Sequence, residues 1–257
     1  MKGKNVMKNK ISGKIVALLL TLIIVATSGM PLYAKETGDK ANSFRYENGQ
    51  SIAKAVPFST LSPNAWKKID GKYYSGDGSV IEGAVAKGID VSHHQGTVDW
   101  KKAKEDGVEF AIIRCGFGMN QTKQDDAQWF NNVKGCEENN IPYGVYLYSY
   151  ADTVKKAQSE AEHVLRLIKG HTLAYPVYYD IEEKAVLNKL TAEQLGKIAA
   201  TFVNKVKAEG YQTGIYSNKS NFETFLTDSQ FSQWNKWVAQ YNSAACTYKG
   251  TYQIWQA

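Results

Sequence analysis

Two acidic residues, Asp180 and Glu182, stand two positions apart at the end of a short apolar run. The run from Pro176 to Glu182 predicts a buried strand, and side chains two apart on a strand project from the same face. Two carboxylates on one face repel, so one tends to keep its proton near neutral pH while the other stays ionised. Cleavage of a glycosidic bond needs such a pair, an acid for the leaving oxygen and an anion that orders water or supports positive charge. The alternative is two solvated acids at an exposed strand end.

A third acidic residue, Asp90, ends another short strand within Lys87–Gly96, before a glycine-marked loop and the segment Val98-Asp99-Trp100. We expect Asp90 to share a pocket with the first two acids and to position substrate or a neighbouring carboxylate. The alternative is a local role, in which Asp90 caps the turn at Ser92–Gln95.

Strands and helices alternate along the chain from residue 87, which implies βα units with a parallel sheet. Besides the segments that carry the three acids, strands are predicted at Phe110–Gly116, Tyr143–Tyr150, Thr213–Asn218, Trp237–Tyr241 and Tyr252–Gln256. Helical spacing of apolar residues predicts helices at Asp99–Gly107, Asp125–Asn139, Thr153–Lys169, Thr191–Gly210 and Ser220–Leu226. No helix is predicted between the last two strands.

This ordered set of segments, over residues 87–257, resembles the glycoside hydrolase family 25 lysozymes. The resemblance implies an α/β fold, a TIM-like modified barrel with five βα units followed by strands without helices. It also implies hydrolysis of the β-1,4 bond between N-acetylmuramic acid and N-acetylglucosamine in peptidoglycan. Family members usually add one more strand, with a further pocket acid, after Tyr252–Gln256, so we expect the final strand to be missing here. In such barrels the working residues lie at the carboxyl ends of strands.

Under this resemblance we expect three catalytic residues. Glu182 is the general acid, and Asp180 acts electrostatically on the substrate's N-acetyl group or on an attacking water. Asp90 completes the pocket. Residues in or at the ends of predicted strands, where a sugar ring can stack or bond, are expected to bind substrate, with core packing as the alternative for each aromatic: Tyr148, Tyr216, Trp237, Gln240, Tyr241 and Trp255.

Two other functions stay open. A chitinase of glycoside hydrolase family 18 also ends a strand in D-x-E, but its fuller D-x-x-D-x-D-x-E run is absent, because Tyr175 and Tyr178 stand at the earlier acidic positions. A wall-binding protein that keeps the groove and has lost catalysis is favoured by the expected loss of the final strand.

The amino-terminal segment predicts export. Five lysines precede the apolar run Ile15–Ala26, which a small-residue and proline break follows, so we assign residues 1–34 to a signal peptide. Without these lysines, 26 of the 31 basic residues remain against 25 acidic ones, and the near-neutral balance gives no reason to expect nucleic-acid binding. We expect a monomer that is secreted or associated with the cell wall, with peptidoglycan as its partner and no membrane contact after signal cleavage.

Residues 35–63 have the polar composition of a linker. Residues 64–86 differ, because Trp66–Tyr74 followed by Asp77-Gly78 predicts a hairpin with an Asp-Gly turn. This segment resembles a single cell-wall-binding repeat. One copy alone is expected to pack on the catalytic barrel, residues 87–257, or to space it from the signal, with wall binding as the alternative.

Neither a metal nor another cofactor is expected. His93 and His94 follow Asp90, but adjacent side chains point apart and no third ligand stands at helical spacing. His163 and His171 are expected at the surface. The three cysteines, Cys115, Cys136 and Cys246, form no C-x-x-C pair and are not expected to staple the fold.

Overall fold

The computed structural model describes residues 46–47, 50–51, 62–241 and 244–257. The expected signal peptide at 1–34 lies outside these residues, as does most of the expected linker at 35–63. Two short strands, β1 (Tyr46–Glu47) and β2 (Gln50–Ser51), pair antiparallel. In the part of the chain that is described, no helix combines the length and the apolar character that a membrane crossing needs.

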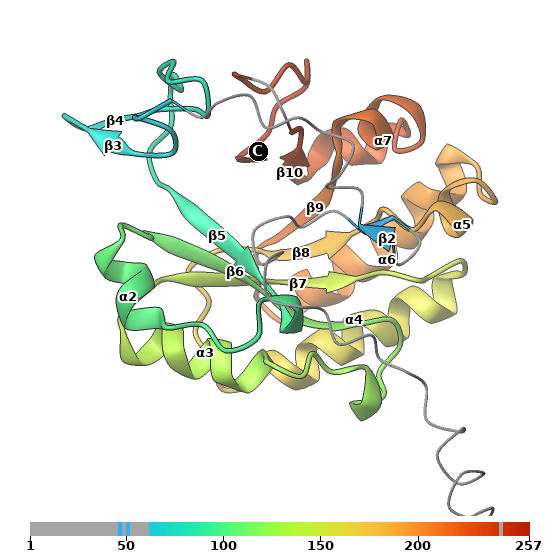
Figure 1. The fold of residues 1–257 in the computed structure, drawn as a ribbon. Coiled ribbons are helices and arrows are strands. Elements are labelled where there is room, and N and C mark those ends of the chain that lie inside the picture. The colour runs from blue at the N-terminus through green and yellow to red at the C-terminus, as the bar shows by residue number, and fades with distance from the viewer. Residues whose placement is uncertain (1–45, 48–49, 52–61, 242–243) are drawn as a thin grey trace, which may run out of the picture. The chain divides into compact units, whose positions relative to one another are not determined.

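Seven parallel strands form the central sheet (Figure 1). Their order is β11-β10-β9-β8-β7-β6-β5, so each strand lies beside the strand that precedes or follows it in the chain. The strands are β5 (Gly88–Val91), β6 (Phe110–Phe117), β7 (Tyr143–Tyr148), β8 (Val177–Asp180), β9 (Thr213–Asn218), β10 (Asn235–Ala239) and β11 (Ile254–Gln256).

Helices connect the first six of these strands, and β10 passes to β11 without one. The α-helices are α2 (Trp100–Glu105), α3 (Trp129–Glu138), α4 (Val154–Ile168), α5 (Lys184–Leu187), α6 (Ala192–Ala208) and α7 (Lys219–Thr224). Short 3-10 turns are η3 (His93–Gln95), η4 (Thr122–Gln124) and η5 (Ser229–Gln233). The expected α/β modified barrel, five βα units followed by strands alone, is therefore confirmed.

The helix boundaries follow from local capping. Thr153 begins α4 by accepting a hydrogen bond from the Lys156 amide, and Thr191 with Gln194 forms a complete capping box at the start of α6. Just beyond the end of α6, Gly210 has a φ of +87°, a conformation that costs glycine little. These residues mark where α4 and α6 begin and where α6 ends.

The sheet separates two apolar layers. Its outer face packs against α3, α4 and α6, and this layer is filled by fully buried side chains such as Val145, Leu147 and Ile215. Its inner face carries a smaller, aromatic-rich cluster that includes Tyr178, Tyr216 and Trp237. Because side chains alternate along each strand, every second residue of a strand faces this inner cluster.

The two edge strands approach each other because the sheet curls. The Gln256 side-chain amide on β11 donates a 2.8 Å hydrogen bond to Asp90 Oδ1 on β5, at the opposite edge of the sheet. A flat seven-stranded sheet would hold its edges roughly 28 Å apart at the usual strand spacing, so this contact requires strong curvature.

Several expected boundaries were wrong by a few residues, and two of them bear on the acids and their surroundings. Strand β8 ends at Asp180 rather than at Glu182, although the Ile181 amide still bonds to the Tyr216 carbonyl and so keeps the chain extended beside β9. Helix α3 begins at Trp129 rather than at Asp125, because the Asp125 side chain is bound by residues of α4 and does not cap α3.

Residues 62–86 contain the expected hairpin, formed by β3 (Lys68–Ile69) and β4 (Lys72–Tyr73). Its turn is Asp70-Gly71, where φ is 49° and 76°, and not Asp77-Gly78. A two-residue turn of this type needs positive φ at both central positions. Asp77-Gly78 makes a second turn instead, between the paired residues Tyr74 and Val80.

The hairpin is bonded to the base of the sheet through Glu109. This carboxylate accepts hydrogen bonds from Lys68 Nζ at 2.7 Å, from the Tyr73 hydroxyl at 2.6 Å and from the Lys87 amide at 2.8 Å. Burial alone would raise the pKa of Glu109, but these bonds hold it at about 2. A second contact joins the rings of Trp66 and Trp255, 6.2 Å apart.

Candidate active site at the carboxyl ends of the strands

The three acids found in the sequence gather at the carboxyl end of the sheet. Asp90 lies on β5 and Asp180 is the last residue of β8, while Glu182 follows two positions later. Asp180 is 2 % exposed, and its Oδ1 has no hydrogen-bond partner within the described residues. Asp90 and Glu182 are half-buried. Asp90 accepts its bond from distant Gln256, not from the turn that follows it, so the local capping role is not what the structure shows.

Burial and mutual repulsion keep protons on this set of carboxyls. Burial raises the pKa of Asp90 to about 6. Burial first, and then the charges of Asp90 and Glu183, raises the pKa of Glu182 to about 7. The pKa of Asp180 lies well above its usual value because of burial and then of repulsion from Glu182. The site can therefore hold an acid and an anion together near neutral pH.

A buried cation lies close enough to the acids to act on Asp180. Arg114, in the middle of β6, is 8 % exposed, and its Nε donates to Asp126 Oδ2 at 2.7 Å. Asp126 also accepts from the His93 amide at 3.0 Å, and the His93 ring contacts the Arg114 guanidinium. Burial would raise the pKa of Asp126, but the hydrogen bond to His93 and the charge of Arg114 hold it at about 2. The positive charge of Arg114 also lowers the pKa of Asp180.

Tyrosine hydroxyls surround the carboxyls. Tyr148 donates a 3.2 Å hydrogen bond to Glu183 Oε2, next to Glu182. Burial raises the pKa of Tyr146 and of Tyr216 well above the usual value, so both hydroxyls stay neutral near their acidic neighbours. The acids therefore face neutral hydrogen-bonding groups and aromatic rings, surroundings that suit a sugar ring.

Trp237 forms the floor of the inner face rather than an open wall. It is 3 % exposed and lies edge-on to Tyr146 and Tyr178, with ring centroids 5.6 and 5.5 Å away, and 4.4 Å from the ring of Tyr216. Trp237 therefore packs in the core of the inner face, which was the alternative to binding substrate.

The remaining expected binding residues differ in placement. Tyr241 and Gln240 line a cavity of about 470 Å³ at the carboxyl ends of β9 and β10, on the same end of the sheet as the acids. The Gln240 side chain is bonded to Thr247, because its Oε1 accepts a 2.8 Å hydrogen bond from the Thr247 backbone amide. Trp255 alternates with Ile254 and Gln256 on β11, and its indole donates to the Gln240 carbonyl at 2.8 Å. The structure therefore does not bring the Trp255 indole N–H to the carboxyls.

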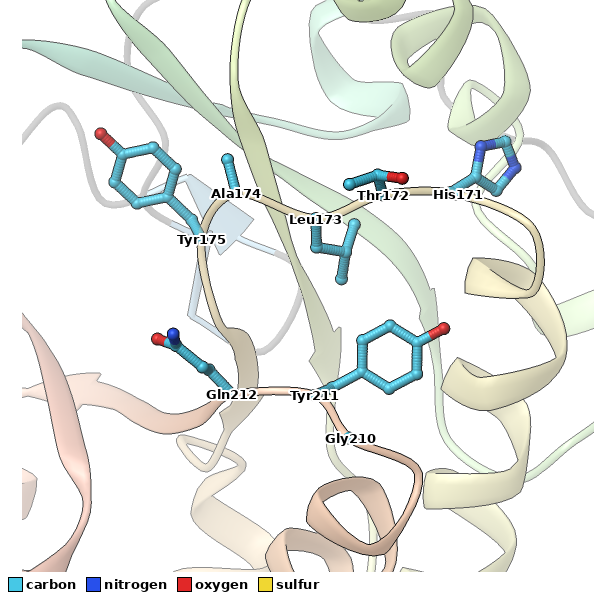
Figure 2. A pocket seen from close by; sticks show the side chains of 8 residues that line it. All are labelled: His171, Thr172, Leu173, Ala174, Tyr175, Gly210, Tyr211 and Gln212. Carbon is cyan, nitrogen blue, oxygen red and sulfur yellow. The ribbon is translucent and has the colours of Figure 1, made fainter.

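A second cavity, of about 320 Å³, lies at the opposite end of the sheet between the loops that lead into β8 and β9 (Figure 2). Leu173 and Tyr211 lie in these two loops, and His171 at the rim is paired with Glu137 at 2.9 Å. No carboxyl with a raised pKa lines it, so it lacks the chemistry found at the carboxyl end.

The histidines have structural partners. His163, which was expected at the surface, is 0 % exposed, because its two ring nitrogens bond to the Gly118 carbonyl at 3.0 Å and to Asp125 at 2.8 Å. His93 is held by Asp126. Within residues 62–241 and 244–257, no group of three or more His, Cys, Asp or Glu side chains has the arrangement of a metal site.

Comparison with known proteins decides the family. The model of the glycosyl hydrolases family 25 matches residues 89–257, which is most of the chain and all seven strands of the sheet except the first residue of β5. The chain belongs to glycosyl hydrolase family 25. The resemblance inferred from the strand segments and their three acids is therefore confirmed.

Relatives in this family are lysozymes and autolysins. The chain is 28 % identical over 155 residues to an autolytic lysozyme of Clostridium acetobutylicum, covering 60 % of this chain and 45 % of that protein. It is 31 % identical to the modular autolysin LytC of Streptococcus pneumoniae, solved with a synthetic peptidoglycan ligand, with a TM-score of 0.64 over 74 % of this chain and 47 % of that one. The chain thus spans about half the length of each.

A more distant structure shares the fold. The family 25 lysozyme of Aspergillus fumigatus is 21 % identical, with a TM-score of 0.56, and the match covers 66 % of this chain and 84 % of that one. The modified barrel of family 25 is therefore kept at low sequence identity.

Sequence reasoning missed the cation and its anchor. The sequence did carry a signal for Arg114, because it is a charged residue inside the apolar strand Phe110–Gly116. A charge in such a strand indicates a buried ion pair. Asp126 gave no comparable signal, because its partners His93 and Arg114 lie 33 and 12 positions away.

Proposed function

We propose that this chain is a secreted lysozyme that hydrolyses the β-1,4 bond between N-acetylmuramic acid and N-acetylglucosamine in peptidoglycan. The observation that carries the proposal is the convergence of three carboxyls with raised pKa at the carboxyl end of a family 25 barrel. Lysozyme and autolysin relatives, one of them solved with a peptidoglycan ligand, support this choice of substrate.

In this proposal Glu182 is the general acid. Its pKa of about 7 leaves a large share of the carboxyl protonated at neutral pH, ready to protonate the leaving oxygen. Tyr148 and Asp90 lie close enough to Glu182 to interact with it electrostatically. Substrate reaches the acid from the end of the sheet where Tyr241 and the cavity of about 470 Å³ lie.

Asp180 acts as the anion. Residues two apart along one extended segment are too close to flank a sugar ring from opposite faces, so Asp180 and Glu182 do not form an ordinary acid-plus-nucleophile pair. Asp180 instead orients the substrate's N-acetyl group, or an attacking water, and stabilises the positive charge that develops there. Trapping of a covalent glycosyl ester on Asp180 would contradict this role.

The test compares the parental chain with Glu182→Gln on purified peptidoglycan and on chitin. We expect lysis of peptidoglycan only, and a drop of roughly 10²–10⁴-fold in turnover for the variant while its binding to peptidoglycan persists. Glu193→Gln, which alters a surface carboxylate on α6, is the matched control. Lysis of chitin in preference to peptidoglycan, or binding without lysis by the parental chain, would reject the proposal.

The rest of the chain serves export and placement in this proposal. Residues 1–34 direct secretion and residues 35–63 link the signal to the folded part, so the protein acts at the cell wall. We expect it to act there as a monomer. Residues 64–86 belong with the catalytic barrel at 87–257. The bonds from Lys68 and Tyr73 to Glu109 support that grouping, because they use polar groups of the hairpin on the barrel itself.

A further inference from the structure

We infer that Arg114 is a positioning residue that places the negative charge of the carboxyl set on Asp180 and leaves the proton to Glu182. The inference rests on the proposed function, because it assigns the charge states that hydrolysis requires. Arg114 acts on Asp180 through its charge and not through a hydrogen bond or a contact with substrate.

The register of the strands puts Arg114 where its charge can act. Arg114 pairs with Tyr146 on β7, and the next inward residue of β7, Tyr148, pairs with Asp180 on β8. Strands β6 and β8 both adjoin β7, so their backbones are roughly 10 Å apart. Arg114 is 8 % exposed, so little water screens its charge, and Arg114 and Asp180 each shift the pKa of the other.

Two side chains fix the guanidinium. Asp126, which is 4 % exposed, accepts a 2.7 Å hydrogen bond from Nε–H, and Nδ1 of the His93 ring contacts Nη2. Asp126 is itself held by the amides of His93 and Gln128, at 3.0 and 2.8 Å. The arginine therefore cannot swing onto Asp180 as a closed ion pair, and its charge is shared between Asp126 by contact and Asp180 through space.

The groups that face Asp180 from the surrounding elements are otherwise acids and phenols. They are Glu182 on its own segment, Tyr146 and Tyr148 on β7, Tyr216 on β9 and Asp90 on β5. Burial, Glu182 and Asp90 all raise the pKa of Asp180, and among the described residues Arg114 is the charge that lowers it. For Glu182 the acting charges are those of Asp90 and Glu183. Arg114 therefore opposes the rise in the pKa of Asp180, which still stays well above its usual value, and it is not among the charges that shift the pKa of Glu182.

The test measures kcat/KM on peptidoglycan against pH for the full chain and for three variants. The acid limb reports the ionisation of the coupled carboxyl set as it gains its anion. In Arg114→Gln the anion loses its cation, so we expect the acid limb to move to higher pH by roughly 1 unit or more. In Asp126→Asn the arginine loses its competing anion, so the limb should move to lower pH. Arg114→Lys keeps the charge and should stay close to the parental limb.

The opposite signs separate positioning from structural support. If the Arg114–Asp126 pair only held the fold, removing either partner would lower activity without moving the limb in opposite directions. Arg166→Gln breaks another arginine–aspartate ion pair, with the more exposed Asp125, and is the control in which the acid limb should not move. Should Arg114→Gln fail to fold, the downward shift in Asp126→Asn still decides the matter, and an unmoved or rising limb there overturns the inference.

A second readout does not depend on hydrolysis. Titration of the Asp180 carboxyl by carbon NMR, assigned with Asp180→Asn, should show a higher pKa in Arg114→Gln and a lower one in Asp126→Asn. Failure of the parental chain to lyse peptidoglycan would reject the proposed function and leave this titration standing. A parental chain that lyses peptidoglycan, with the Asp180 titration unchanged in both variants, would reject the role of Arg114 alone.

Discussion

The side-chain amide of Gln256 donates a hydrogen bond of 2.8 Å to Asp90, a residue 166 positions earlier in the chain. The two residues stand on opposite edge strands of the sheet, β11 and β5. The bond takes one oxygen of Asp90 and so sets the direction in which the other faces. An acid that belongs to the first strand of the sheet is thus oriented from the last.

Removal of the Gln256 amide should disturb catalysis more than stability. In Gln256→Ala the Asp90 carboxyl loses its donor and can turn away from Glu182, so we expect kcat to fall roughly 10-fold, which corresponds to the loss of about one hydrogen bond. Gln212→Ala, an exposed glutamine at the other end of the sheet, is the control. Equal rates of peptidoglycan hydrolysis for both variants would show that the bond has no role in orientation.

Neutralisation of Asp90 should stabilise the protein at high pH. Its pKa of about 6, against an ordinary 3.8, means that the folded state holds a proton that the unfolded state has lost between these values. Stability therefore falls as pH rises from about 4 to 6, by an amount on the order of 3 kcal/mol. Asp90→Asn keeps the oxygen that Gln256 bonds, so its melting temperature at pH 8 should exceed the parental one by several degrees.

The same comparison at pH 4 supplies the control for Asp90→Asn. At pH 4 the parental carboxyl is protonated in the folded state and about half protonated in the unfolded state, so most of the difference is gone and the two melting temperatures should nearly converge. A variant that melts at or below the parental temperature at pH 8 would refute the prediction.

Glu109 should have the opposite pH dependence. Its pKa of about 2 lies below the ordinary 4.5, so its stabilising effect is present above pH 4.5 and is lost as pH falls toward 2. We expect Glu109→Gln to melt at a lower temperature than the parental chain at pH 7 and to lose the hairpin earlier in limited proteolysis. The difference should narrow below pH 4. Asp106→Asn, which removes an exposed pair with Lys102, should change little.

Two aromatic residues near the acids should respond differently to truncation. Trp237, at 3 % exposed, supports the inner face, so Trp237→Ala should cost about 3–5 kcal/mol of unfolding free energy. Tyr241 is half-buried on the cavity at the carboxyl end of β10, so Tyr241→Ala should raise KM and change stability little. Chemical denaturation and steady-state kinetics on both variants check the assignment, and a raised KM with native stability in Trp237→Ala would reverse it.

The architecture was predictable because its signals are local. Apolar runs and capping residues such as Thr153 and Thr191 mark helices within a few positions. The missing helix between β10 and β11 was visible because the alternation of strand and helix patterns stops there. The hairpin turn was misplaced because two Asp-Gly pairs lie close together. The choice between them depends on which flanking residues find partners, such as Tyr73 with Glu109.

The candidate site was predictable only in its acids. Charged residues at the ends of predicted strands are easily recognised, as are Asp90, Asp180 and Glu182. The carboxyl ends of parallel strands lie at the same edge of the sheet, so these three acids were expected to be close together. The binding residues were less certain, because a strand aromatic such as Trp237 has the same pattern whether it packs in the core or lines a groove. Arg114 was missed because Asp180, whose pKa it lowers, is 66 positions away in the sequence. The charge of Arg114 acts on that carboxyl through space.

The order of the strands also has a kinetic consequence. Since each strand pairs with its neighbour in the chain, the sheet can grow from β5 toward β11 by successive short loop closures, and each closure costs little chain entropy. Growth in this order gathers Asp90, Arg114 and Asp180 early, whereas the amide of Gln256 arrives with the strand at the far edge. A folding intermediate that lacks only this strand would carry the acids with Asp90 still free to turn. Docking of β11 would then be the step that brings the site to its working geometry.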